Sequence, residues 1–132
     1  RGEIALHLHP WPVLGPASVL GGRATAAAER LRPGAGHALH ARLLRSAFPP
    51  SPPVLARVAE ELDLDPDRLA AEMRGPAVDR RLAEAAALAR LFGFIGTPGI
   101  VIGRTGGEGA LPGPTLRAMI ADARAAGTPC RA

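Results

Sequence analysis

The chain has 132 residues, of which 47% are apolar, and a formal net charge of +4 at pH 7. This length and apolar content suit one domain with a modest core, so we expect residues 1–132 to form a single domain. Every basic residue is an arginine, these arginines are spread along the chain, and aromatic side chains make up only 3%. Nucleic-acid binders gather their basic residues on one face and add aromatics for stacking, so the composition argues against a nucleic-acid partner.

The sequence contains no apolar stretch long enough to predict a membrane span and no signal segment, so we expect no membrane partner. A single cysteine, Cys130, cannot form an internal disulfide. Cysteine usage therefore leaves the compartment open between the periplasm and the cytoplasm of a bacterium. We interpret Cys130 as an exposed thiol of the C-terminal tail; the alternative is a thiol that forms an intermolecular or mixed disulfide with a partner.

The first expected element is a strand over residues 3–9, where apolar and other side chains alternate with the period of a half-buried strand. The apolar face consists of Ile4, Leu6 and Leu8. The strand ends at Pro10-Trp11-Pro12, because two prolines cannot continue a strand or a helix. Trp11 has two interpretations: an aromatic contact in a binding groove, or a plug that seals the edge of the sheet.

Four or five helices are expected next, because apolar residues recur there at helical spacing. Ser51 and Asp65 each precede a proline, which is typical of a capped helix start. Gly75 and Gly93 are natural helix ends. The expected helices cover residues 16 or 18 to 30, 38–47, 52–62, 66–74 and 76–92.

After Gly96 the periodicity changes. A β-branched run at residues 100–102, between two glycines, predicts a short interior strand. The next three residues predict a tight reversal into a weaker strand near residues 107–110. A helix over residues 114–126 completes the expected order, and Gly127 ends it.

The segment Gly96-Thr97-Pro98, directly before the interior strand, is the main candidate site. Proline cannot donate a hydrogen bond to a strand ladder, so it is expected where a strand edge stays open. X-Pro bonds adopt the cis form at low cost. A cis Thr97-Pro98 bond would leave the Thr97 amide and carbonyl free to pair with an extended chain. The alternative is that Thr-Pro only shapes a turn.

These motifs resemble a known family. Gly96-Thr97-Pro98 leading into residues 100–103 resembles the cis-proline loop of the DsbA family of thiol oxidoreductases. Residues 108–120 resemble the last strand and helix of that family, and residues 8–18 resemble its strand and exit loop. His40 falls where the family often has a Phe-His pair that opens a helix of its helical insertion.

The resemblance implies an α/β, incomplete thioredoxin-like fold with a large all-helical insertion between the first strand and a C-terminal β-hairpin plus helix. Residues 1–14 and 94–127 would form the thioredoxin-like part, and residues 15–93 would form the insertion. It also implies an extended polypeptide as substrate or partner. The implied substrate-binding residues are Gly96, Thr97 and Pro98, with Trp11 and His40 in a possible groove.

The sequence departs from the family in its cysteines and in its last strand. It contains no Cys-x-x-Cys, and Cys130 aligns with neither thiol. Disulfide exchange needs a reactive thiolate and a resolving thiol, so we expect no catalytic residue and a redox-inactive chain. Gly106 and Gly107 stand where the family usually has β-branched residues, which predicts a weakened final strand.

The strand that precedes the Cys-x-x-Cys helix in the family also has no counterpart in the sequence. In the thioredoxin sheet it lies between the strands that match residues 3–9 and 99–103, so its absence would expose two edges. Residues 3–9 could pair with residues 99–103, another chain could supply the strand, or the sequence could be a piece of a longer protein. We expect self-association, because a shared sheet would pair both edges.

Histidines occur in two pairs, and neither pair has a third ligand at suitable spacing. His7 and His9 would share a strand face, and His37 and His40 would share a helix face. We therefore expect no metal and no cofactor. Three functions remain open: a redox-inactive member of the oxidoreductase family, a non-catalytic peptide-binding or assembly module, and a relative of the glutathione-dependent isomerases and transferases of the same fold.

Overall fold

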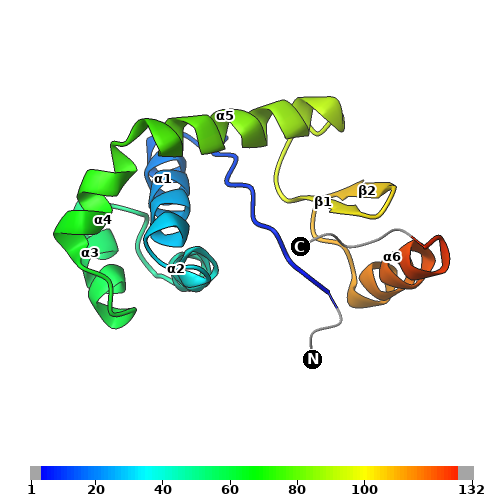
Figure 1. Ribbon diagram of the computed structural model, residues 1–132, viewed down its shortest axis with the longest axis horizontal. Coiled ribbons are helices and arrows are strands. Elements are labelled where there is room, and N and C mark those ends of the chain that lie inside the picture. The colour runs from blue at the N-terminus through cyan, green and yellow to red at the C-terminus, as the bar shows by residue number, and fades with distance from the viewer. Residues whose placement is uncertain (1–3, 128–132) are drawn as a thin grey trace. The chain divides into compact units, whose positions relative to one another are not determined.

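The structure is a computed structural model that describes residues 4–127. In this part of the chain six helices and one two-stranded sheet occur (Figure 1). Their order is α1 (Pro16–Leu31), α2 (Ala35–Leu44), α3 (Pro52–Glu61), α4 (Pro66–Met73), α5 (Pro76–Leu91), β1 (Gly99–Ile102), β2 (Thr105–Glu108) and α6 (Gly113–Ala125). None of the described helices is long and apolar enough to cross a membrane.

The chain divides into two compact units, which we describe separately. The helical unit comprises residues 8–87, and the hairpin unit comprises the described residues 4–7 and 88–127. The division of the family's domain into residues 1–14, 15–93 and 94–127 stays a prediction.

The helical unit is built around α1, which packs against both α2 and α4. The buried face of α1 carries small residues, so neighbouring helices approach it closely. A Cβ atom on Gly36 of α2 would lie only 2.8 Å from the carbonyl oxygen of Thr25 on α1. Larger side chains fill the rest of the core, with Leu39, Leu69 and Val78 fully buried. Burial of this apolar surface is the main stabilising contribution to the unit.

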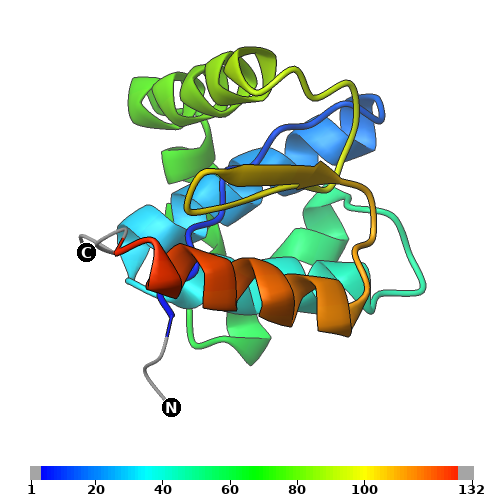
Figure 2. The ribbon, with the colours of Figure 1, turned by 90° about the vertical axis from the view of Figure 1, so that its right-hand side faces the viewer.

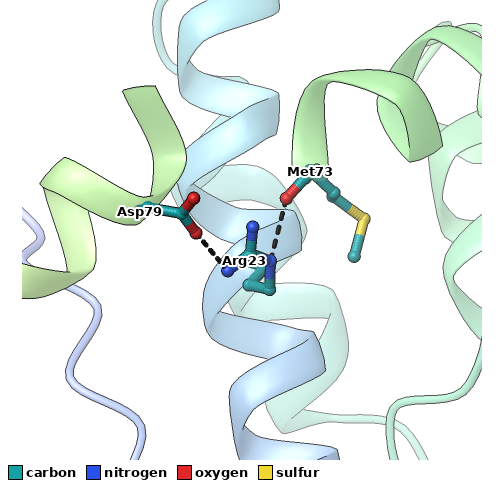
Figure 3. A network of polar contacts seen from close by, with 3 residues as sticks. All are labelled: Arg23, Met73 and Asp79. Carbon is teal, nitrogen blue, oxygen red and sulfur yellow. Dashed lines mark hydrogen bonds and ion pairs between the residues drawn. The ribbon is translucent and has the colours of Figure 1, made fainter. Parts of the chain in front are cut away.

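Two arginines, Arg23 of α1 and Arg32 directly after α1, bind the C-terminal ends of two other helices. Arg23 donates from Nε to the carbonyl oxygen of Met73, the last residue of α4, at 2.8 Å, and from Nη1 to Asp79 of α5 at 2.6 Å (Figure 3). Arg32 donates to the carbonyl oxygen of Leu62, just after α3, at 2.6 Å. The last carbonyls of a helix have no partner inside the helix, so these arginines satisfy groups that would otherwise need water.

Two of the expected helix starts differ in how they are capped. Asp65 caps α4 as predicted, because its carboxylate accepts from the N–H groups of Asp67 and Arg68. Ser51 precedes α3 but its side chain makes no capping hydrogen bond. The second position of α3 is Pro53, which has no N–H, so one of the two N–H groups that could donate to a Ser51 cap is absent.

Helix α2 begins three residues earlier than the predicted range of 38–47 and ends at Leu44. Glu29 of α1 explains the early start. Its carboxylate accepts from the N–H groups of Gly34 and Gly36 at 2.9 and 3.0 Å, so a neighbouring helix caps α2. The run of glycines there predicted a break, whereas this long-range cap makes it a helix N-terminus.

The predicted strand over residues 3–9 is wrong for residues 4–9, which form no strand; residue 3 lies outside the described part. The sheet of the described chain contains only β1 and β2, paired antiparallel, so these residues do not pair with residues 99–103 either. Alternating apolar residues favour a strand only where a partner backbone satisfies its N–H and C=O groups. Here the described chain offers none.

The turn of the hairpin is shorter than predicted. Figure 2 shows the hairpin from a second side. Ile102 pairs with Thr105 across a two-residue turn, so β2 starts two residues before the predicted range of 107–110. Strand β1, predicted to be interior, has one strand neighbour in the described chain, and Val101 is 39% exposed. Helix α6 packs against β1.

Candidate functional site

The candidate site is a loop over residues 95–98, which connects α5 to β1. Helix α5 ends at a glycine as predicted: Gly93 has φ of 70°, and the N–H of Phe94 donates to the carbonyl of Ala89 at 2.9 Å. This left-handed turn ends the helix and sends the chain toward β1. Within the loop, the Thr97-Pro98 peptide bond is cis.

Two consecutive residues at the end of β2 fix the two ends of this loop. The N–H of Ile95 donates to the carboxylate of Glu108, at 3.2 Å from Oε1 and 3.4 Å from Oε2. The N–H of Gly109 donates to the carbonyl oxygen of Pro98 at 2.8 Å. The 95–98 loop is therefore held on the hairpin from both sides.

Between these two contacts, Thr97 is exposed. Within residues 4–127, the backbone N–H and C=O groups of Gly96 and Thr97 make no hydrogen bond. Backbone groups that are exposed and unpaired on a held loop are available to an extended polypeptide, which can pair with them as a strand does. Unpaired backbone groups were expected from the sequence for Thr97. Binding of a polypeptide by Gly96, Thr97 and Pro98 stays a prediction.

The open edge of β1 continues directly from the loop. In a two-residue hairpin the residues flanking the turn exchange hydrogen bonds, and the pairs then alternate between bonded and non-bonded. Ile102–Thr105 flanks the turn, and the Gly109–Pro98 bond has the same parity. By this alternation the N–H and C=O groups of Gly99 and Val101 point away from β2, toward the edge that has no partner in the described chain.

Phe94 and Leu111 explain the glycines of the hairpin. A Cβ atom on Gly99 would lie 2.4 Å from the ring of Phe94, and one on Gly107 would lie 2.7 Å from Leu111. A Cβ atom on Gly106 would lie 3.7 Å from the Phe94 ring. The glycines were expected to weaken the last strand, but they also give large side chains room to lie directly on the backbone. Strand β2 forms with this packing.

Several apolar side chains near the loop are exposed. Ile95 is 91% exposed and Leu91 is 77% exposed. Phe92 stacks on Phe94 with ring centroids 5.8 Å apart and is itself half exposed. Exposed apolar residues that cluster in sequence around a loop with unpaired backbone groups are typical of a contact surface for another chain.

Trp11, His37 and His40, which the sequence also singled out, belong to the helical unit. Trp11 and His40 are half-buried there, so the groove predicted to include them and the 95–98 loop stays a prediction. Burial lowers the pKa of His40, and the nearby imidazole of His37 lowers it further. The Nε2 atom of His37 is buried without a hydrogen-bond partner in the described chain.

No group of three or more His, Cys, Asp or Glu within residues 4–127 is arranged to hold a metal ion. Cys130, interpreted as a tail thiol, lies outside the described residues. The sequence reasoning missed Glu108 and Phe94. The signal that could have identified Glu108 is the pairing register of the hairpin. It places Glu108 opposite Gly99, the residue directly after the 95–98 loop.

The chain is similar to known proteins of one family. The family model for the DSBA-like thioredoxin domain matches residues 3–123. Among solved structures, a thioredoxin-like oxidoreductase from Silicibacter pomeroyi DSS-3 matches with a TM-score of 0.81 and 31% sequence identity, over 89% of this chain and 66% of that one. About a third of that neighbour's chain lies outside the match. No curated protein matches the chain in sequence.

Proposed function

The chain belongs to the DSBA-like thioredoxin domain family, and we propose that it is the polypeptide-contacting part of a thiol-disulfide oxidoreductase-type protein. The resemblance drawn from the motifs is thereby confirmed, and so is the thioredoxin-like fold class, apart from the strand at residues 3–9. In this proposal the 95–98 loop receives an extended polypeptide through the backbone of Thr97.

The proposal rests on the unpaired backbone of Thr97. This residue lies between the two contacts that hold the loop. Gly96 faces the Glu108 carboxylate, where a Cβ atom would lie 3.2 Å from Oε1. Pro98 has no N–H and uses its carbonyl to bind Gly109. Gly96 and Thr97 are both left with a backbone donor and acceptor, but Gly96 is half-buried, whereas Thr97 is exposed. The free N–H and C=O of Thr97 match the two hydrogen bonds that one residue of an added strand makes.

Titration of the 15N-labelled chain with an extended octapeptide, followed by amide chemical shifts, tests this contact. We expect shifts centred on Gly96, Thr97 and the outward groups of β1. The Thr97→Ala variant, which keeps the backbone, should bind as the original chain does, whereas Thr97→Pro, which removes the N–H, should bind at least several-fold more weakly. Unchanged binding by a folded Thr97→Pro variant would contradict the proposal.

We further propose that this 132-residue chain is redox-inactive by itself, because it has one cysteine and dithiol exchange requires two. In an insulin-reduction assay with dithiothreitol, turbidity should develop no faster than with dithiothreitol alone. The matched control is Cys130→Ser, which should give the same curve. Acceleration that disappears in Cys130→Ser would show that the tail thiol is active and would refute this part.

The unpaired edge of β1 favours assembly as a second candidate function. We propose that a second copy or another chain adds a strand along the outward groups of Gly99 and Val101. Light scattering at micromolar concentration should then show self-association that Val101→Pro abolishes, since proline removes an outward N–H without affecting the bonds to β2. A monomer at all concentrations would exclude self-association. The glutathione-dependent alternative stays a hypothesis.

A further inference from the structure

We propose that Glu108 is a positioning residue of the 95–98 loop and makes this site prefer extended polypeptides that carry a basic side chain next to the residue bound at Thr97. This inference rests on the proposed function, because it names the class of polypeptide that the loop would receive.

The geometry around Glu108 is the first step. Glu108 is the last residue of β2 and lies opposite Gly99. Its carboxylate accepts from the N–H of Ile95, thirteen residues earlier in the chain. The same carboxylate lies against Gly96. The N–H of Ile95 is shared between the two carboxylate oxygens, at 3.2 and 3.4 Å, so the hydrogen bond has a charged acceptor. The side chain thus holds the first residue of the loop, while the Gly109–Pro98 bond holds the last.

The charge of Glu108 is the second step. Its carboxylate is exposed and forms no ion pair with an arginine of the described chain. One N–H uses only part of its hydrogen-bonding capacity, since a carboxylate has about four acceptor positions. A negative charge with unused acceptors therefore borders Gly96, the residue before the proposed contact.

The rest of the hairpin unit has the opposite sign. Its described residues contain two carboxylates, Glu108 and Asp122, and four arginines: Arg90, Arg104, Arg117 and Arg124. Glu108 is the carboxylate that contacts the loop. A basic side chain of a bound polypeptide would be attracted to it and an acidic one repelled, and complementary charges of this kind select partners more than they add affinity.

The test uses two octapeptides with the same uncharged centre, one flanked by arginines and one by glutamates, titrated into the 15N-labelled chain. The original chain should bind the basic peptide about two- to fivefold more tightly at low salt, as expected for an exposed charge pair. About 0.5 M salt should remove most of the difference. Equal affinities at low salt would overturn the charge preference.

Three variants separate the two roles of Glu108. Glu108→Gln keeps an acceptor for Ile95, so the Ile95 amide should keep its shift and slow exchange while the preference for the basic peptide disappears. Glu108→Ala should lose both, with faster exchange at Ile95 and weaker binding of both peptides. Asp122→Asn removes the other carboxylate of the unit and should change neither.

The outcomes distinguish this inference from the proposed function. If neither peptide shifts the Thr97 amide of the original chain, the proposed function fails and the preference fails with it. If both peptides bind at Thr97 but Glu108→Gln keeps the preference, only the role assigned to the charge is wrong. If Ile95 exchanges equally in Glu108→Ala and the original chain, Glu108 is not a positioning residue.

Discussion

The helical unit and the hairpin unit differ in how many of their apolar side chains are buried. In the helical unit a continuous core of apolar residues joins all of its helices, from Ala24 on α1 to Val78 on α5. In the hairpin unit the buried apolar residues of the described chain are Ala89 and Met119, while Ile95 and Leu91 are largely exposed. A two-stranded sheet alone is marginally stable in water. The unit with the candidate site therefore has the less complete core.

Core truncation should give the largest difference between the units. Leu39 is fully buried on α2, so Leu39→Ala should lower the free energy of unfolding of the helical unit by about 2–5 kcal/mol. Met119→Ala on α6 should cost clearly less, because fewer buried neighbours surround it. Urea unfolding followed by circular dichroism, with amide shifts to assign each unit, measures both. Equal losses would show that the two cores are equivalent.

Loss of the two Arg23 hydrogen bonds should have the next largest effect on the free energy of unfolding. Arg23→Ala removes a charged donor from the Met73 carbonyl and from Asp79, for which we expect a loss of about 1.5–3 kcal/mol in the same experiment. Arg42→Ala is the matched control. Its pair with Glu61 is exposed and 3.6 Å long, so it should cost at most about 1 kcal/mol. Similar losses in both variants would contradict a structural role for Arg23.

The hairpin unit should instead be sensitive to small additions. Gly99→Ala would place a methyl group against the Phe94 ring, and overpacking of this kind costs about 1–3 kcal/mol. We expect altered amide shifts along β1, β2 and the 95–98 loop, with the helical unit unchanged. Adding Phe94→Leu should relieve the contact and restore part of the pattern. A silent Gly99→Ala variant would show that the ring does not need the glycine.

The smallest effect should be a pH dependence confined to the helical unit. The pKa of His40 is lowered from its ordinary value of 6.5, so the folded state binds fewer protons than the unfolded state. The stability is therefore fully present above about pH 6.5 and decreases as the pH falls toward the lowered pKa of the folded state. His40→Gln should flatten this part of the stability profile. A profile that is unchanged in the variant would assign the dependence to another group.

Much of this organisation could be predicted from local patterns. Helix α4 starts at Asp65 as expected, because a capping aspartate followed by proline acts through adjacent residues. Gly93 ends α5 and residues 100–102 form a strand for similarly local reasons. The motif around Thr97-Pro98 also led to the correct family. The predictions failed where a residue outside the local pattern determines the structure. The start of α2 is an example, because Glu29 of α1 caps it.

The candidate site shows the same division. The sequence by itself determined where the loop lies, since the proline, the glycines and the β-branched run act over a few residues. Only the tertiary structure decided that Glu108 and Gly109 hold the loop, that Phe94 covers the glycines, and that residues 4–9 form no strand. Each of these depends on which backbone or side chain comes close in space, and the hydrogen bonds and contacts involved have no signature in the local pattern.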